Sequence, residues 1–144
     1  RDEYQPAQLI YRPNGETLIR REIRIKPRGN SRREICYFPP LKLNFVKSNF
    51  RYENLVDLDK MKMVSYCKKG KAFEAYHLKE YLCYRILNIL TPNSFKVRLV
   101  KMRYVDTGRK KNNTHDSFAF LIEPVKRLAH RLEFEELEQV KVLD

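Results

Sequence analysis

The sequence lacks any long apolar run, since no stretch approaches the ~18 consecutive apolar residues of a membrane-spanning helix. It also begins at Arg1, without an initiator methionine or an apolar leader, so we expect a trimmed or processed chain and assign no compartment. Hydrophobic residues nevertheless make up 42% of the 144 residues. This content predicts a folded protein, and the length suits one domain, residues 1–144.

Cysteine is scarce, and its pattern excludes several site types. Cys36, Cys67 and Cys83 form no CxxC pair and have no histidine at ligand spacing, so a structural zinc is not expected. The odd count argues against a disulfide framework, although it leaves one bridge open. We expect buried free thiols.

Common catalytic motifs are absent too. There is no Walker loop, no GxGxxG and no paired-acid motif. His77, His115 and His130 are scattered, and none has a serine or cysteine beside it in a nucleophile motif. We expect His77 to be a packing or solvent-facing residue. Hydrolytic chemistry therefore has little support.

Basic residues are abundant: 30 lysines and arginines outnumber 18 acidic residues and give a formal charge of +12. This charge indicates a polyanionic partner, which could be nucleic acid, a phosphorylated ligand or an anionic surface. The basic residues are spread along the chain, so a merely solvated basic surface is the other interpretation.

Alternating and helical patterns predict the fold class. Residues 8–26 read as a hairpin around Asn14-Gly15, a dipeptide suited to tight turns, and Pro27 ends the second strand. The remaining strands are expected at residues 41–45, 61–66, 94–105 and 118–123. The pattern therefore predicts an α+β fold, an antiparallel β-sheet with one buried helix packed on it and a short C-terminal helix.

The details of these elements are also expectations. The helix covers residues 71–90, is apolar around most of its circumference and ends before Pro92. The apolar phase of residues 94–105 slips between Leu99 and Val100, which predicts a β-bulge. Loops are expected at residues 48–60 and 106–117, and the last helix starts near Pro124.

Two charged residues stand out against this framework. Lys42 lies on the polar face of the strand "LKLNF", and Glu80 lies on an apolar face of the long helix, beside Tyr76 and Tyr84. A buried carboxylate needs a cation, and protein kinases pair a strand lysine with a helix glutamate to hold nucleotide phosphates. The alternative is that Lys42 is solvated and Glu80 meets any nearby arginine.

The order of four motifs resembles the spore coat protein H (CotH) family of atypical bacterial kinases. The motifs are "IRIKPRGNS", "PPLKLNF", "LKEYLCYRIL" and "KVRLVKMRYV…FAFLIE", and they span about residues 19–132. Membership would imply a kinase-like small lobe at about residues 17–123, followed by a linker and helix at 124–144.

The resemblance also implies a set of nucleotide-binding residues. The turn Arg28, Gly29, Asn30 and Ser31 would cover phosphates, Lys42 would contact them and Glu80 would pair with Lys42. Glu123 would lie beside the adenine. ATP and Mg²⁺ are expected only with a complete second lobe, for which this chain has no room, so it supplies no catalytic or metal-ligating residue and should be inactive alone.

Two departures from the family pattern accompany this interpretation. A long basic loop replaces a tight Asn-Gly turn, and Pro124 removes a backbone N–H near the adenine site. A degenerate kinase-like scaffold therefore stays open. So does a non-enzymatic basic module that binds nucleic acid or another polyanion through residues such as Arg109, Lys110 and Lys111. The sequence does not predict an oligomeric state.

Overall fold

The computed structural model describes residues 3–13, 15–29, 31–45, 60–68, 70–108 and 113–136. Within these ranges the elements are, in chain order, β1 (Gln5–Tyr11), β2 (Ile19–Pro27), α1 (Ser31–Ile35), β3 (Leu41–Phe45), β4 (Lys60–Ser65), α2 (Lys71–Leu90), β5 (Val97–Asp106), β6 (Asn113–Ile122) and α3 (Val125–Arg131). The predicted α+β fold is confirmed. The loop expected at residues 48–60 falls almost entirely outside the described residues.

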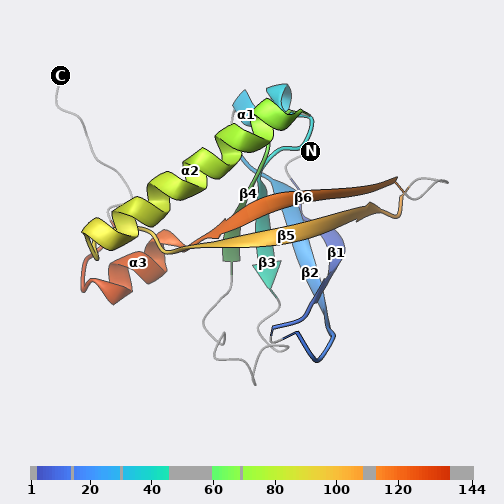
Figure 1. The fold of residues 1–144 in the computed structure, drawn as a ribbon. Helices are drawn as coiled ribbons and strands as arrows, with labels where there is room; N and C mark the ends of the chain where they lie inside the picture. Colours follow the sequence, from blue (N-terminus) through green and yellow to red (C-terminus); the bar gives the residue numbers. More distant parts are fainter. Residues whose placement is uncertain are drawn as a thin grey trace.

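The strands form one antiparallel sheet in the order β1-β2-β3-β4-β6-β5. Strands β1 to β4 follow one another as a meander, and the β5–β6 hairpin then joins the sheet through β6. Figure 1 shows this hairpin crossing over β1, β2 and β3, with α2 lying along one side of the sheet. The chain reaches the hairpin only after α2, so the helix connects the two halves of the sheet.

The sheet carries a core on each face, because successive residues of a strand point to opposite sides. One core contains Met63 and Ala119 with residues from β2 and β3. The other contains Val64 and Phe120, and Tyr81 and Tyr84 of α2 pack against it. Strands β4 and β6 are therefore buried on both faces.

The predicted bulge in β5 is wrong. Its register with β6 runs without interruption from Val97 opposite Ile122 to Asp106 opposite Asn113. The apolar phase changes because β5 serves both cores in turn: Leu99 packs on the helix side and Val100 on the other. A change of buried face, rather than an extra residue, produces the pattern.

The β5–β6 connection is shorter than expected. Residues 106–117 were predicted as a loop, yet β6 already begins at Asn113, which places His115 on a strand. Residues 113–117 are all polar, so no alternation of polar and apolar residues marks this part of the strand.

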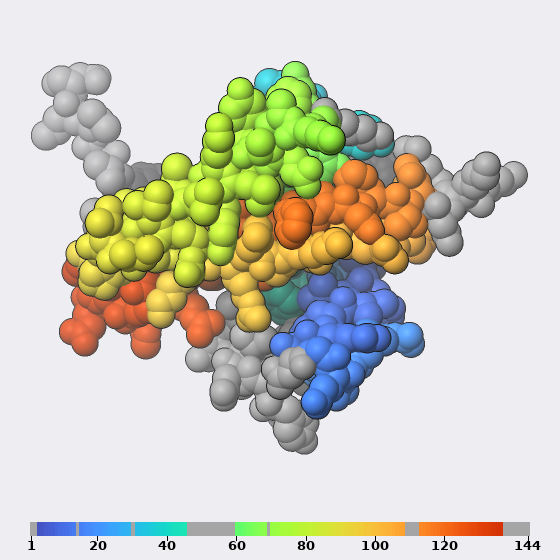
Figure 2. Space-filling view, in the orientation of Figure 1, coloured from blue at the N-terminus to red at the C-terminus, as the bar shows by residue number. Residues whose placement is uncertain are grey.

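Helix α2 has the predicted bounds. It begins after Gly70, whose φ of 123° suits a residue without a Cβ, and ends where the Thr91 amide donates to the Leu87 carbonyl. The expectation that it is largely buried is wrong, since His77 is its single buried residue. Its large exposed apolar residues are Phe73, Tyr76, Leu82, Ile86, Leu87, Ile89 and Leu90. The helix rests mainly on β5 and β6, which cover one narrow stripe, and Figure 2 shows it at the surface of the molecule.

The expectation of free thiols is wrong for two of the three cysteines. Cys36, just after α1, forms a disulfide with Cys67, just after β4, while Cys83 is a free thiol on the exposed side of α2. The partners are 31 residues apart in sequence. No helix among the described residues is both long and apolar enough to cross a bilayer.

Candidate functional site

Three lysines lie directly opposite one another on neighbouring strands. Lys26 of β2 faces Lys42 of β3, and Lys42 faces Lys62 of β4. Directly opposed residues project from the same face of a sheet, so the three lysines share one face. Met63, the neighbour of Lys62, belongs to the core on the face away from α2, so the lysine row lies on the face that carries α2. Like charges in this arrangement repel and destabilise the sheet unless an anion compensates them.

Arg28, just after the end of β2, adds a fourth cation near Lys62. The turn that carries it is held by a bond from the Arg28 amide to the Pro40 carbonyl at 2.8 Å, and Gly29 follows with a φ of 87°. Burial lowers the pKa of Arg28, the neighbouring Arg32 lowers it further, and Tyr84 and Glu80 oppose them. Its Nη1 is buried, and no hydrogen-bond partner reaches it among the described residues. A buried guanidinium nitrogen without an acceptor is costly, so this position is suited to an anion.

Lys62 is half-buried beside Arg28. Burial lowers the pKa of Lys62, the positive charges of Arg28 and Lys42 lower it further, and Glu136 opposes them. The ammonium group is thus surrounded mainly by other cations. A bound anion would relieve this repulsion and raise the pKa of Lys62.

Glu80 does not pair with Lys42. Its carboxylate lies 3.9 Å from Nη2 of Arg32 on α1, and no ion pair joins it to Lys42 in the part of the chain that the structure describes. The alternative stated from the sequence, that Glu80 meets a nearby arginine, describes this contact. Arg32 is the partner of Glu80 because α1 approaches α2 at this point. The positive charge of the lysine row is therefore not compensated by an ion pair with Glu80.

The turn predicted to cover phosphates is only partly described. Arg28 and Gly29 lie at the end of β2, and Ser31 is the first residue of α1. Asn30 lies outside the described residues. The structure brings Arg28 and Lys42 close to Lys62, whereas Glu80 lies near Arg28 and Arg32.

Glu123 is engaged in a separate network. Its carboxylate accepts hydrogen bonds from Arg131 at 3.1 Å and 3.0 Å and from the Lys96 amide at 3.0 Å, and its own amide donates to the Lys96 carbonyl. Burial alone would raise the pKa of Glu123, but these donors outweigh it and lower the pKa. The predicted place beside an adenine stays a prediction, and the carboxylate already has partners within the chain.

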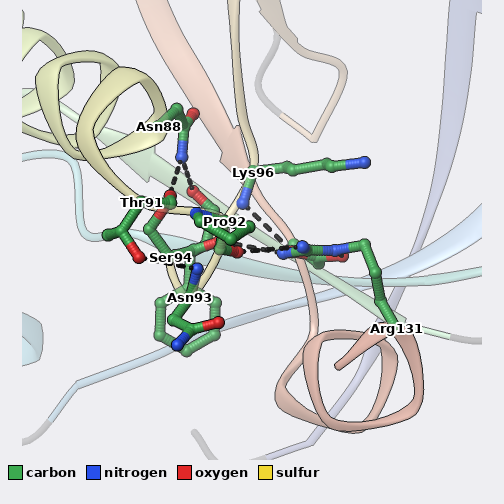
Figure 3. A network of polar contacts seen from close by, with 9 residues as sticks. Asn88, Thr91, Pro92, Asn93, Ser94, Lys96 and Arg131 are labelled. Carbon is green, nitrogen blue, oxygen red and sulfur yellow. Dashed lines mark hydrogen bonds and ion pairs between the residues drawn. The ribbon is translucent and has the colours of Figure 1, made fainter. Parts of the chain in front are cut away.

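Arg131 extends this network to the turn after α2. Its guanidinium donates to the carbonyls of Pro92 at 3.0 Å and Ser94 at 2.9 Å, as Figure 3 shows. Asn88 donates to Ser94 and to the Phe95 carbonyl from the helix side. The network therefore fixes α3 against the α2–β5 connection.

A second polar cluster lies just beyond the end of the β4–β6 pairing. A cavity of about 340 Å³ is lined by residues that include Tyr66, His115, Ser117 and Glu74. The Tyr66 hydroxyl contacts Nε2 of His115, and burial raises the pKa of Tyr104 nearby to about 12. Burial also raises the pKa of Tyr66. Both phenols stay protonated at neutral pH, so the cluster provides no phenolate.

His77 has the packing role that was expected. It stacks on Phe120 with ring centroids 4.9 Å apart, and burial lowers the pKa of its imidazole, which therefore stays neutral.

Sequence reasoning missed Lys62 and Arg32. The stretch "KMKMVS" places Lys62 between two apolar residues, which is the pattern that drew attention to Lys42 in "LKLNF". The same alternation would have identified Lys62. Arg32 could not be found, because its approach to α2 depends on how α1 packs.

Comparisons with protein-family models, with curated proteins and with solved structures found no match. No group of three or more histidine, cysteine or acidic side chains suited to a metal occurs among the described residues.

Proposed function

We propose that this chain binds the phosphates of a nucleotide and is the small lobe of an ATP-dependent phosphotransferase of the CotH-like kind. The observation that carries the proposal is the cluster of Arg28, Lys42 and Lys62, in which a buried guanidinium nitrogen lacks an acceptor. Lysine and arginine side chains are the usual protein ligands of phosphate. The motif order described above adds support.

The position of Lys62 refines the proposal. In protein kinases the lysine that contacts the phosphates pairs with a glutamate of the helix αC. Here α2 is the long helix, the strand preceding it is β4, and Lys62 is on β4. We therefore assign the principal phosphate contact to Lys62, with Lys42 beside it and Arg28 closing the site from the turn.

These residues hold and neutralise negative charge. Phosphoryl transfer depends mainly on positioning and on electrostatic stabilisation, and cations fixed in a partly buried site supply both without reorganising. The described residues do not fit Mg²⁺, because they bring no set of acidic ligands together. Metal binding and the transfer step are therefore not assigned to this part of the protein.

The test is a titration of the purified chain with ATP, followed by calorimetry at low salt. We expect Lys62→Gln to weaken ATP binding roughly ten- to a hundredfold, because a charge-assisted hydrogen bond contributes about 1.5–3 kcal/mol. Lys126→Gln, an exposed lysine of α3, is the charge-matched control and should bind as the parent does. Equal losses in both variants would contradict a specific site.

A second candidate function is the binding of an extended polyanion such as single-stranded nucleic acid. A specific observation favours it: Arg24 and Lys60 flank Asn44 in a second cross-strand row beside the lysines. The two rows extend the basic surface along three neighbouring strands. The same titration separates the functions, since an oligonucleotide that binds much more tightly than ATP would favour the polyanion.

A further inference from the structure

The Cys36–Cys67 disulfide joins the two segments that supply the cations of the phosphate site. Cys36 follows α1, which carries Arg32 and is preceded by the Arg28 turn. Cys67 follows β4, which carries Lys62. The bond therefore ties the arginine-bearing segment to the lysine-bearing strand.

Electrostatics alone would separate these segments. Arg32 lies against Gly29, next to Arg28, and its positive charge lowers the pKa of Arg28. Arg28 in turn lowers the pKa of Lys62. Helix α1 is five residues long and has no buried residue, so it has little packing of its own. A further contact is therefore needed to hold Arg32 beside Arg28.

The contacts that hold the segment after α1 against β4 lie close to the disulfide. The Tyr37 amide donates to the Cys67 carbonyl at 2.9 Å, and the Ser65 hydroxyl donates to the Phe38 carbonyl at 3.2 Å. Cys36 itself is buried, with 8% of its surface exposed. The covalent bond is thus the strongest link in a short attachment.

We propose that the Cys36–Cys67 disulfide holds α1 in place, so that Arg32 stays beside Arg28 at the phosphate site and the chain binds phosphate groups tightly only in its oxidised form. The inference rests on the proposed function. Cys36 and Cys67 are positioning residues, since they act on the anion through Arg32.

The switch is a two-electron thiol–disulfide exchange. A dithiol reductant attacks one sulfur, the Cys36–Cys67 bond breaks and both sulfurs become thiols with two protons from the dithiol, which itself closes to a cyclic disulfide. Oxidation by a disulfide reverses every step. Cys83 is exposed and lies outside the exchange.

The experiment compares inorganic phosphate and ATP binding by oxidised protein and by protein reduced with dithiothreitol. We expect roughly tenfold weaker binding after reduction, as on losing one charge-assisted contact, and recovery after reoxidation. The double variant Cys36→Ser/Cys67→Ser should match the reduced protein and ignore the reductant. Cys83→Ser is the matched control and should respond as the parent does.

A second readout separates positioning from stability. Arg32→Gln should weaken binding by the oxidised protein about tenfold but should change binding by the reduced protein little, because α1 has then moved Arg32 away from the site. A loss of equal size in both forms would overturn the proposal. So would equal affinities of the two folded forms.

Folding is monitored by far-UV circular dichroism throughout. If the reduced protein unfolds, the comparison is repeated with Cys36→Ala/Cys67→Val below its unfolding midpoint, and unfolding of this variant as well would overturn the proposal. An oxidised parent that binds neither phosphate nor ATP would instead contradict the proposed function.

Discussion

The charged side chains fall into two groups, those whose charge is compensated by a partner and those whose charge is not. Glu123 and Arg131 are compensated, with every strong donor directed at an acceptor. Arg28 and Lys62 are less well compensated, because Nη1 of Arg28 is buried without a hydrogen-bond partner among the described residues and the near neighbours of Lys62 are mainly cations. Stability explains the first arrangement, whereas the second costs stability and is better explained by a ligand.

Replacing Glu123 should reveal the compensated arrangement. Glu123→Gln leaves the Arg131 guanidinium without its counter-ion, so we expect a loss of about 1.5–3 kcal/mol in unfolding free energy at pH 7. Urea unfolding measures this, with Glu135→Gln, on the exposed segment after α3, as the control. A change below that of the control would contradict a structural role.

The pH dependence has a defined sign. Because the folded pKa of Glu123 is lowered, its stabilisation is present above the unfolded carboxyl pKa and is lost as the pH falls through the folded pKa. The parent should therefore lose more stability than Glu123→Gln between about pH 5 and pH 2. Parallel curves for both proteins would exclude this linkage.

Helix α2 is the element whose two sides differ most. Tyr81 and Tyr84 pack on the sheet, whereas Ile89 and Leu90 are 82% and 74% exposed. Apolar residues occur all around the helix, so sequence alone could not tell which of them meet the sheet. Contact with two strands decides the buried stripe.

Substitutions on α2 and in the core beneath it should distinguish the exposed side of the helix from the side that packs on the sheet. Ile89→Lys should change the unfolding free energy by less than about 0.5 kcal/mol, because an exposed residue loses little packing. Phe120→Ala, at the centre of the helix-side core, should cost about 3–5 kcal/mol. Denaturant midpoints measure both, and a large loss for Ile89→Lys would indicate that another surface covers it.

Much of the fold could be predicted from sequence, and the reasons are local. Gly70 and Pro92 mark the ends of α2, and alternation identifies β2, β3 and β4. The site could be predicted less well. Lys42 was identified by alternation, but its neighbours Arg28 and Lys62 come together only through strand register and the α1 segment, which depend on tertiary contacts.

Charge is the property that belongs to the whole molecule. The formal charge of +12 gives a long-range attraction for any polyanion, whereas the cation cluster acts at contact distance. Salt screens the first more than the second, since partly buried charges are shielded from ions. The two proposed functions therefore differ in salt dependence.

A salt series should separate the general attraction from the specific site. We expect log affinity for a single-stranded oligonucleotide to fall with log salt by about 0.7 per phosphate contact, and Arg24→Gln/Lys60→Gln to remove about two contacts from that slope. ATP affinity should change less than threefold in the same variant. Fluorescence anisotropy measures binding of the oligonucleotide. An unchanged slope would show that Arg24 and Lys60 do not contact it.

The pairing of β4 with β6 has a consequence for how the chain folds. Residues 62–65 must meet residues 119–122, whereas the β1–β2 and β5–β6 hairpins close over short sequence distances. Closing the longer loop carries the larger entropic cost, so the hairpins and α2 are expected to form early and β4–β6 docking to limit the folding rate. Substitutions in the β4–β6 seam, such as Val64→Ala, should then slow folding, because the seam forms in the rate-limiting step.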